Sequence, residues 1–249
     1  MDKALIDVDF DFTSDTPGFW DNYWDDEMGY STVDPDIYSK TLKEYHKVLW
    51  SKKLPNGKFL NLKNGGRADY LIWENFRFSS DSITTSFRYK RYRYMIKKVI
   101  DFLPNYKQFI ENYVRKDYTI GGSIIFPKMK GSINQKRGYN HFIRDRFDLT
   151  LECIRKYYKN EKSPLYEVLL KNKNFFDLFV DFKGYVDFFY LNDLVDKDYS
   201  SIKFWLGDGD LRKINPLPKS VEEYLLWLDN QLIFVKKRNV RIKNAINKN

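Results

Sequence analysis

The fold is decided by residues 118–158, YTIGGSIIFPKMKGSINQKRGYNHFIRDRFDLTLECIRKYY. The first ten residues are mostly apolar and include Gly121 and Gly122, a pair that within a strand indicates a bulge or a close backbone approach. A basic loop follows, and after it come apolar residues at helical spacing. We therefore expect a buried strand, a loop and an amphipathic helix in this order.

The helix expected over residues 139–158 has an apolar stripe and a charged stripe. Steps of four, four, three and four separate the apolar residues, as on the buried face of an amphipathic helix. Steps of four, four and three separate the charged residues, which therefore stack along a second stripe. The apolar stripe consists of Ile143, Phe147, Leu151, Ile154 and Tyr158, and the charged stripe of Arg144, Asp148, Glu152 and Arg155.

The charged stripe allows two interpretations. In the first, Arg144 and Arg155 neutralise two carboxylates that would otherwise repel each other, and the stripe is a set of structural ion pairs. In the second, Asp148 and Glu152 are catalytic or bind Mg²⁺, and the arginines bind a phosphate. The pattern favours the first interpretation, because charged helix faces are usually paired or solvated.

The loop expected over residues 134–138 precedes this helix. It brings Asn134 and Arg137 to a helix N-terminus, where free N–H groups and the helix dipole attract anions. One interpretation is a phosphate or carboxylate clamp. The other is a surface turn with Gly138 at a position that needs positive φ.

Five stretches carry a resemblance to a known family. They are DPDIYSKTLKEYHKVLWSKKLPNG (34–57), YTIGGSIIFP (118–127), INQKRG (133–138), DRFDLTLECIRKYY (145–158) and FKGYVDFFYLNDLV (182–195). Together they resemble a bacterial family catalogued only as a domain of unknown function. The likeness covers most of the chain, but it implies no activity. The chain departs from the family pattern in its acidic and aromatic N-terminal segment and in its high lysine and asparagine content.

The composition is basic and rich in aromatic residues. The 249 residues include 43 Lys and Arg against 34 Asp and Glu, and 18% are aromatic. The formal net charge of +9 favours anionic partners. An AT-rich bacterial or phage genome would also enrich lysine, asparagine, tyrosine and phenylalanine. The single cysteine, Cys153, excludes internal disulfides and fits a reducing cytoplasm, and we expect neither a signal peptide nor a membrane span.

The N-terminal part alternates apolar residues with aspartates over residues 6–12, which predicts a half-buried edge strand. Residues 13–30 are rich in acids and tryptophans. Rigid amphipathic rings among charges make good contact anchors, so this segment suits a lid or a loop that binds a protein partner.

The next element is a helix expected from about Asp36 to Trp50, with Asp34 or Ser39 as its cap. His46 lies on this helix among lysines. Its ordinary pKa range suits general acid-base catalysis, and His46 is therefore a candidate catalytic residue. A structural role for a single histidine on a helix is the alternative.

Three further strands are expected as an antiparallel meander, with turns at residues 64–66 and 79–81. They cover residues 58–62, 70–78 and 82–87.

Residues 87–98 interleave basic residues with tyrosines. This combination supplies charge for phosphates and rings for stacking on bases, as in nucleic-acid binding. The competing interpretation is a helix with a tyrosine-lined inner face and a solvated basic face. The candidate contacts to the nucleic-acid backbone are Arg88, Arg91 and Arg93.

The second half of the chain predicts helices. Residues 163–189 are rich in phenylalanine and suit a series of short helices. A last helix is expected from Pro218, with Ser220 and Glu223 as a capping box. Its inner stripe is expected to consist of Val221, Leu225, Leu228, Leu232 and Val235.

These patterns together predict one α+β domain over residues 1–249, dominated by helices, with a small, mainly antiparallel sheet. Residues 1–33 form an N-terminal extension or loop, and residues 34–249 form the family-like region. The leading hypothesis is a cytoplasmic bacterial or phage protein that engages nucleic acid or a nucleotide phosphate. It extends to a phosphodiester- or phosphoryl-transfer enzyme in phage-host conflict. The alternative is a non-catalytic protein-interaction module that acts through residues 13–30.

Overall fold

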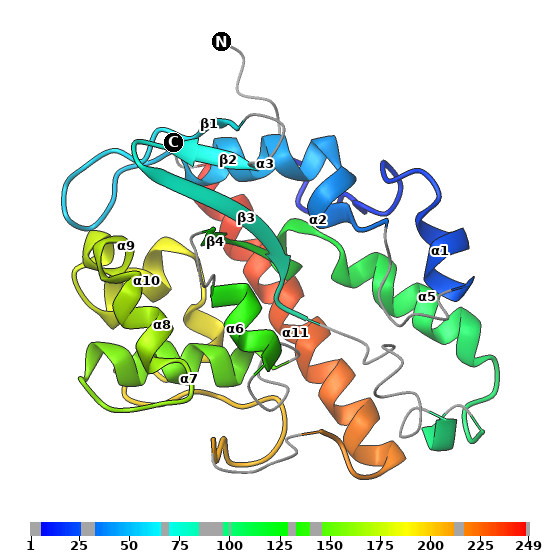
Figure 1. The fold of residues 1–249 in the computed structure, drawn as a ribbon. Helices are drawn as coiled ribbons and strands as arrows, with labels where there is room; N and C mark the ends of the chain where they lie inside the picture. The colour runs from blue at the N-terminus through cyan, green and yellow to red at the C-terminus, as the bar shows by residue number, and fades with distance from the viewer. Residues whose placement is uncertain are drawn as a thin grey trace.

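The structure, a computed structural model, describes residues 6–25, 33–65, 70–84, 97–99, 101–128, 133–139, 146–211 and 217–247. It confirms the α+β class, with helices dominating and a small antiparallel sheet in the strand order β1-β2-β3-β4 (Figure 1). The strands are β1 (Lys63–Asn64), β2 (Leu71–Trp73), β3 (Phe76–Ser82) and β4 (Ser123–Pro127). The α-helices are α1 (Phe19–Asp25), α2 (Pro35–Tyr38), α3 (Lys40–Trp50), α5 (Tyr106–Asp117), α6 (Ile133–Tyr139), α7 (Phe147–Tyr158), α8 (Tyr166–Lys171), α9 (Lys173–Phe176), α10 (Phe182–Phe188) and α11 (Val221–Ile246). Short 3₁₀ turns are η2 (Ile120–Gly122), η4 (Asp177–Phe179) and η5 (Asn192–Leu194).

Strand β3 is the longest strand of the sheet and has a neighbour on each side. It pairs with β2 through Phe76–Phe78 and with β4 through Phe78–Ser82. The turn predicted at residues 79–81 is wrong, because these residues lie inside β3, where they pair with the apolar residues 124–126 of β4. Pairing across the sheet outweighs the local turn preference of serine and aspartate. The hairpin turn lies at residues 74–75 instead, where Glu74 adopts a φ of +48°.

The other predicted strands also need correction. Residues 6–12 form turns, although Ile6, Val8 and Phe12 are buried as the alternation predicts. The Asp7 and Asp11 carboxylates accept hydrogen bonds from backbone N–H groups two residues ahead, an arrangement that competes with strand formation. Residues 58–62 contribute a single bridge, between Lys53 and Phe59.

The central stretch folds differently from its predicted boundaries. Gly121 and Gly122 lie in η2 just before β4, instead of inside a strand. The segment predicted as a basic loop is helical and forms α6. The amphipathic helix starts later than predicted, at Phe147, and its described N-terminal side chains pack into the core.

Helix α11 is 26 residues long and crosses the molecule behind the sheet (Figure 1). Its predicted capping box is confirmed in part: the Glu223 N–H donates to Ser220 Oγ at 3.2 Å, but the Glu223 carboxylate accepts from the Lys219 N–H at 2.6 Å instead of from the Ser220 N–H. The predicted inner stripe is rotated, because Leu225 and Leu232 are only half-buried. The larger rings of Trp227 and Phe234, seven residues apart, take the inner positions.

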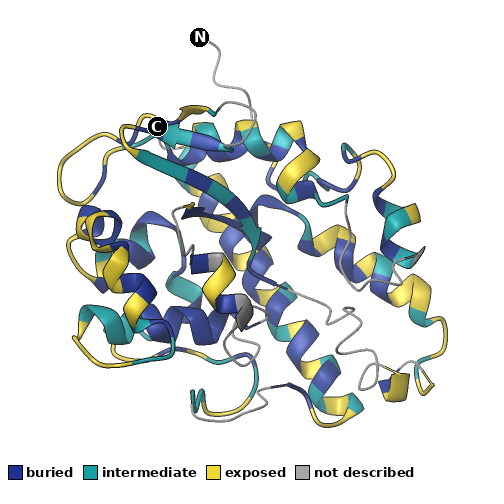
Figure 2. Ribbon diagram, viewed as in Figure 1, coloured by how far each residue is buried: buried dark blue, intermediate teal, exposed yellow. Residues whose placement is uncertain are grey.

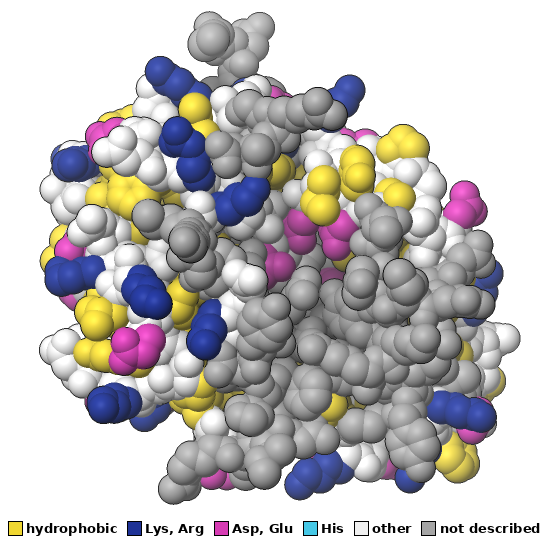
Figure 3. Space-filling view, in the orientation of Figure 1, with side chains coloured by type: hydrophobic (Ala, Val, Ile, Leu, Met, Phe, Trp, Pro, Cys, Tyr) yellow, Lys and Arg dark blue, Asp and Glu magenta, His cyan; other side chains and the backbone are white. Residues whose placement is uncertain are grey.

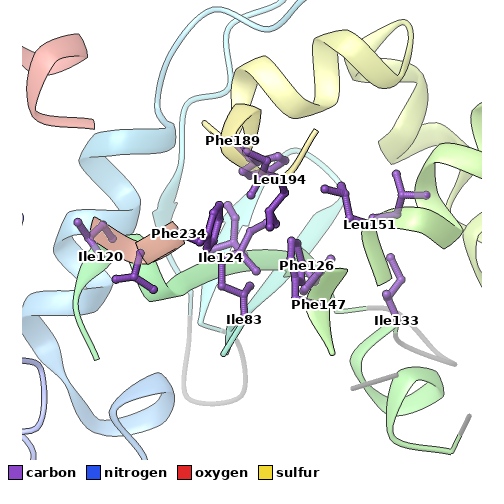
Figure 4. Close-up of a cluster of buried hydrophobic side chains, with 14 of the residues drawn as sticks. Ile83, Ile120, Ile124, Phe126, Ile133, Phe147, Leu151, Phe189, Leu194 and Phe234 are labelled. Carbon is purple, nitrogen blue, oxygen red and sulfur yellow. The ribbon is translucent and has the colours of Figure 1, made fainter. Parts of the chain in front are cut away.

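The hydrophobic core joins the sheet to the helices around it. Ile124 and Phe126 of β4 point towards Phe147 of α7 and Phe234 of α11 (Figure 4). Helix α7 is buried along most of its described length, as Figure 2 shows in dark blue. None of the helices within the described ranges is both long and apolar enough to cross a membrane.

Replacing Gly122 by alanine should destabilise the fold by about 1–3 kcal/mol, because a Cβ there overlaps the Asp117 carbonyl oxygen. Urea unfolding measures this loss. Gly57→Asn is the control: Gly57 has a φ of +89° and no atom near its Cβ direction, and asparagine tolerates positive φ. Equal stability of Gly122→Ala and the parent would contradict the packing described here.

Candidate functional site

Asp148, the first of the predicted catalytic carboxylates, is fully buried at the start of α7. Arg146 forms a bidentate ion pair with it: Nε donates to Oδ1 at 2.9 Å and Nη2 donates to Oδ2 at 2.6 Å. The Trp205 N–H also donates to Oδ2, at 2.9 Å, and Arg146 donates to the Leu206 carbonyl oxygen at 2.7 Å. Asp148 therefore ties α7 to the segment around residue 205.

Glu152, the second carboxylate, lies one turn further along α7 and is 7% exposed. Arg155 donates from Nε to Oε2 at 2.7 Å and from Nη2 to Oε1 at 2.8 Å. Each carboxylate of the charged stripe thus has an arginine of its own. This geometry favours the structural ion-pair interpretation of the stripe.

A shared metal site at Asp148 and Glu152 stays a prediction. Across the described ranges, no group of three or more His, Cys, Asp or Glu side chains is arranged to hold a metal ion. A cavity of about 120 Å³ lies beside Arg146 and is lined in part by Leu206, Asp208 and Asp210. Because ligand pockets usually measure about 300–1,000 Å³, this cavity is too small for a nucleotide.

Arg137, predicted as a phosphate ligand, is fully buried on α6. Its guanidinium forms an ion pair with Asp81 of β3, and its Nε donates to Thr150 Oγ1 of α7 at 2.9 Å. The Cζ atom lies 5.2 Å from the ring centroid of Phe126 and 5.7 Å from that of Phe147. Arg137 therefore links the sheet to both helices of the central stretch.

The partner of Arg137 belongs to a second set of polar groups, which we call the β3 polar centre: Asp36, Ser80, Asp81, Ser82, Ser123 and Arg137. Asp36 of α2 accepts a hydrogen bond from Ser80 Oγ at 2.5 Å and from the Ser82 N–H at 2.8 Å. Ser80 Oγ lies 3.2 Å from Ser123 Oγ of β4. Acidic side chains gather near the middle of this face of the molecule, over α2 and the end of β3 (Figure 3).

The two faces of β3 divide this centre. Side chains alternate along a strand, so Ser80 and Ser82 point to the α2 side and Asp81 to the α6 side. The carboxyl groups of Asp36 and Asp81 thus lie on opposite faces of the same stretch of β3, and the charge of Asp81 acts on Asp36.

Asp36 has a perturbed acidity. Burial of its carboxyl group raises its pKa well above the usual value, and the neighbouring carboxylates of Asp34 and Asp81 raise it further. The hydrogen bonds from Ser80 and Ser82 act in the opposite direction without cancelling the effect. An aspartate with a raised pKa beside an ion-paired aspartate is an arrangement suited to general acid-base chemistry.

Sequence reasoning missed this centre. Asp34 was expected only as a helix cap, a role it does fill by accepting from the Asp36 N–H at 3.0 Å. Asp36 and Asp81 lie 45 residues apart in the sequence, and only the pairing of β3 with β4 brings Ser80 beneath α2 and Asp81 beside α6. The available signal was two short polar clusters, DPD and SSDS, each next to an apolar run.

His46, the third predicted catalytic residue, lies elsewhere. It is fully buried on α3, with ring contacts to Trp50 and Tyr70. Burial, together with the charge of Arg238, lowers the pKa of His46 to about 3, so its imidazole is neutral at physiological pH. Neither ring nitrogen has a hydrogen-bond partner within the described structure. These surroundings favour the structural interpretation of His46.

The other predicted site residues are Arg155, Asn134 and four further arginines. Arg155 pairs with Glu152, as described above. Asn134 belongs to the backbone of α6, but its side chain lies outside the described structure. The predicted ligands outside the described residues are Arg88, Arg91, Arg93 and Arg144.

Replacing Asp148 by alanine should cost about 3–5 kcal/mol of folding free energy, because it removes a counter-charge beside the buried Arg146. Glu152→Ala, at a more accessible pair on the same helix, should cost about 1 kcal/mol or less. Urea unfolding of both variants measures the difference. If Asp148→Ala proves too unstable to purify, Asp148→Asn gives the same ranking. An Asp148 variant as stable as the parent would show that the buried pair is not structural.

The pH dependence of stability tests the environment of Asp36. Because its folded pKa lies above the unfolded value of about 3.8, the folded state holds this proton to higher pH. The parent therefore loses stability relative to Asp36→Asn as pH rises from about 4 towards neutrality. Chemical denaturation at several pH values measures the gap between the two proteins. A gap that does not change with pH would mean that the acidity of Asp36 is ordinary.

Comparison with known proteins identifies a family. No curated protein and no solved structure matches the chain. The model of a family of unknown function, DUF6994, matches residues 6–242, which is nearly the whole chain. The resemblance noted in the sequence is thereby confirmed at the level of a family without an assigned function. The chain belongs to the family DUF6994.

Proposed function

We propose that this chain is a cytoplasmic bacterial or phage protein that engages nucleic acid or a nucleotide phosphate, with acid-base chemistry at the β3 polar centre. One observation carries the proposal: Asp36, hydrogen-bonded to Ser80 and Ser82, has a raised pKa next to the carboxylate of Asp81. Cleavage of a phosphoester needs a group that gives a proton to the leaving oxygen and a group that accepts one from the nucleophile. Asp36 fits the first role.

Asp81 supports this role from the opposite face of β3, because its charge raises the pKa of Asp36, and Arg137 is the positioning residue of Asp81. The buried guanidinium forms an ion pair with Asp81 and is itself fixed by Thr150 and two aromatic rings. A carboxylate held in this way has little freedom to turn away from its position beside Asp36. The same arginine supplies a fixed positive charge close to the place where a phosphate would bind.

The charge of the whole chain supports an anionic substrate. A net charge of +9 raises the local concentration of polyanions and accelerates their association. In this proposal Arg88, Arg91 and Arg93 contact the nucleic-acid backbone. Their side chains supply the charge and the neighbouring tyrosines supply stacking.

The alternative function, protein binding through residues 13–30, has less support. In the described part of this segment, Trp24 Nε1 donates to Glu111 at 2.9 Å, and the Arg115 guanidinium lies 4.7 Å from the ring centroid of Trp20. Phe19 and Tyr23 belong to the core. These rings dock α1 on α5 and leave fewer anchors for a partner.

Binding of labelled single-stranded RNA and DNA at increasing salt tests the first half of the proposal. The logarithm of the association constant should fall linearly with the logarithm of salt concentration. Replacing Arg88, Arg91 and Arg93 together by alanine should make that slope shallower by about 2, since each lost phosphate contact contributes about 0.7. Lack of binding at low salt would overturn the nucleic-acid proposal.

Turnover of the same oligonucleotides tests the second half. Asp36→Asn should lower the cleavage rate by about 10²-fold or more while leaving binding intact, because only proton transfer is lost. Asp193→Asn is the control, since this aspartate pairs with Arg241 at the surface, away from β3. Equal rates for Asp36→Asn and the parent would remove Asp36 from the chemistry even if binding is confirmed.

A further inference from the structure

Helix α11 carries a line of exposed aliphatic side chains on the side that faces away from the core. Leu226 is 54% exposed, Ile233 51% and Val240 52%. They are seven residues apart, and seven residues make almost two full turns of an α-helix, so the three side chains lie on one side. Leu226, Ile233 and Val240 thus form a row of half-exposed aliphatic side chains along the helix.

Charged residues fill the positions between these side chains. The heptad spacing of four and three runs through Glu222, Leu226, Asp229, Ile233, Lys236, Val240 and Lys243, and these residues are all exposed. Acids therefore flank the row in the first half of the helix and lysines flank it in the second half. Within the described ranges, no salt bridge or side-chain hydrogen bond engages Asp229, Lys236, Lys237 or Lys243.

We propose that this face of α11 pairs with α11 of a second copy of the chain, antiparallel, with Ile233 on the two-fold axis. Ile233 is the midpoint between Leu226 and Val240, seven residues from each. An antiparallel arrangement centred there places Leu226 of each copy against Val240 of the other. Such a surface is self-complementary, as the interface of a two-fold symmetric dimer must be.

The charges on α11 favour the antiparallel direction of pairing and a second copy of the chain as the partner. In the antiparallel arrangement Asp229 of one copy faces Lys237 of the other, and Glu223 faces Lys243. In a parallel arrangement each of these residues would face its own copy, and like charges would repel each other. The aliphatic row is one residue wide and has acids beside it, so it is too narrow and too acidic at one end to suit a lipid surface.

The size of the face sets the expected strength. Three aliphatic side chains with charged neighbours form an interface smaller than that of an obligate dimer. Association must also overcome the loss of translational and rotational freedom. We therefore expect a dimer that dissociates on dilution.

Sedimentation equilibrium over a range of protein concentrations tests the proposal. The parent should change from monomer to dimer as concentration rises. Ile233→Lys should weaken dimerisation by at least tenfold, because it places two like charges on the two-fold axis. Leu170→Lys is the matched control, since Leu170 is also an exposed aliphatic residue, 44% exposed, on a different helix. A monomer at every concentration, or a dimer unaffected by Ile233→Lys, would overturn the proposal.

Charge exchange tests the direction. Asp229→Lys and Lys237→Asp should each weaken the dimer, and the double variant should restore it, because the two positions face each other across the axis. Failure of the double variant to recover would exclude the antiparallel register. Ile233→Cys adds a direct test: it should form an intermolecular disulfide under mild oxidation, and the native Cys153 is buried and does not compete. These side chains are exposed, so circular dichroism should show an unchanged fold.

Discussion

The structure depends on the hydrogen bonds that the buried guanidinium of Arg238 donates through Nε and Nη1. This side chain of α11 is fully buried and donates to three backbone carbonyl groups: Gly121 at 2.9 Å, Ser123 at 2.7 Å and Phe189 at 3.1 Å. These carbonyls belong to η2, to β4 and to the residue that ends α10, so one side chain joins three segments to the long helix. Burial lowers the pKa of Arg238 to about 9, which still leaves it charged at neutral pH.

The position of α11 has consequences for everything around it. Gly121 must lack a side chain, because a Cβ there would approach the Val235 carbonyl oxygen to 2.5 Å. Lys52 lies among aromatic rings near this arginine, 3.9 Å from the ring centroid of Tyr190, and burial together with the Arg238 charge lowers its pKa to about 7. With α11 anchored in this way, β4 is fixed, and β3 pairs with β4 over five residues. The β3 polar centre is therefore built on a strand that is held indirectly by Arg238.

Much of the fold was predictable because it rests on local patterns. The fold class, the Ser220 cap of α11 and the apolar side of α7 follow from spacing and caps within one segment. The helix predicted from about Asp36 to Trp50 is divided at Ser39 into α2 and α3, and the two proposed caps, Asp34 and Ser39, each cap one of them. The wrong predictions, at residues 6–12 and 79–81, both concern hydrogen bonds of the backbone. In residues 6–12, Asp7 and Asp11 accept hydrogen bonds from nearby backbone N–H groups, and these bonds compete with strand formation. In β3, pairing with β4 places the serines in a strand, a contact that the sequence of β3 alone does not contain.

The candidate site shows the same limit. The charged stripe of α7 was visible in the sequence, and so was its structural interpretation, but the burial of Asp148 was not, because its partners include a backbone N–H 57 residues away. Arg137 was predicted from the sequence as a phosphate ligand. Its ion pair with Asp81 is visible only in three dimensions, because it depends on the packing of α6 against the sheet.

The contact between Asp36 and the Ser82 N–H has one more consequence. Strand β3 extends beyond β2, so its last residues have a neighbouring strand on the β4 side alone, and α2 covers the other side. An uncovered strand border is a template on which further chains can add as strands and aggregate. The short helix α2 thus acts as a protective cap on the sheet, and the carboxyl group that gives the candidate site its acidity also keeps neighbouring molecules from joining the sheet there.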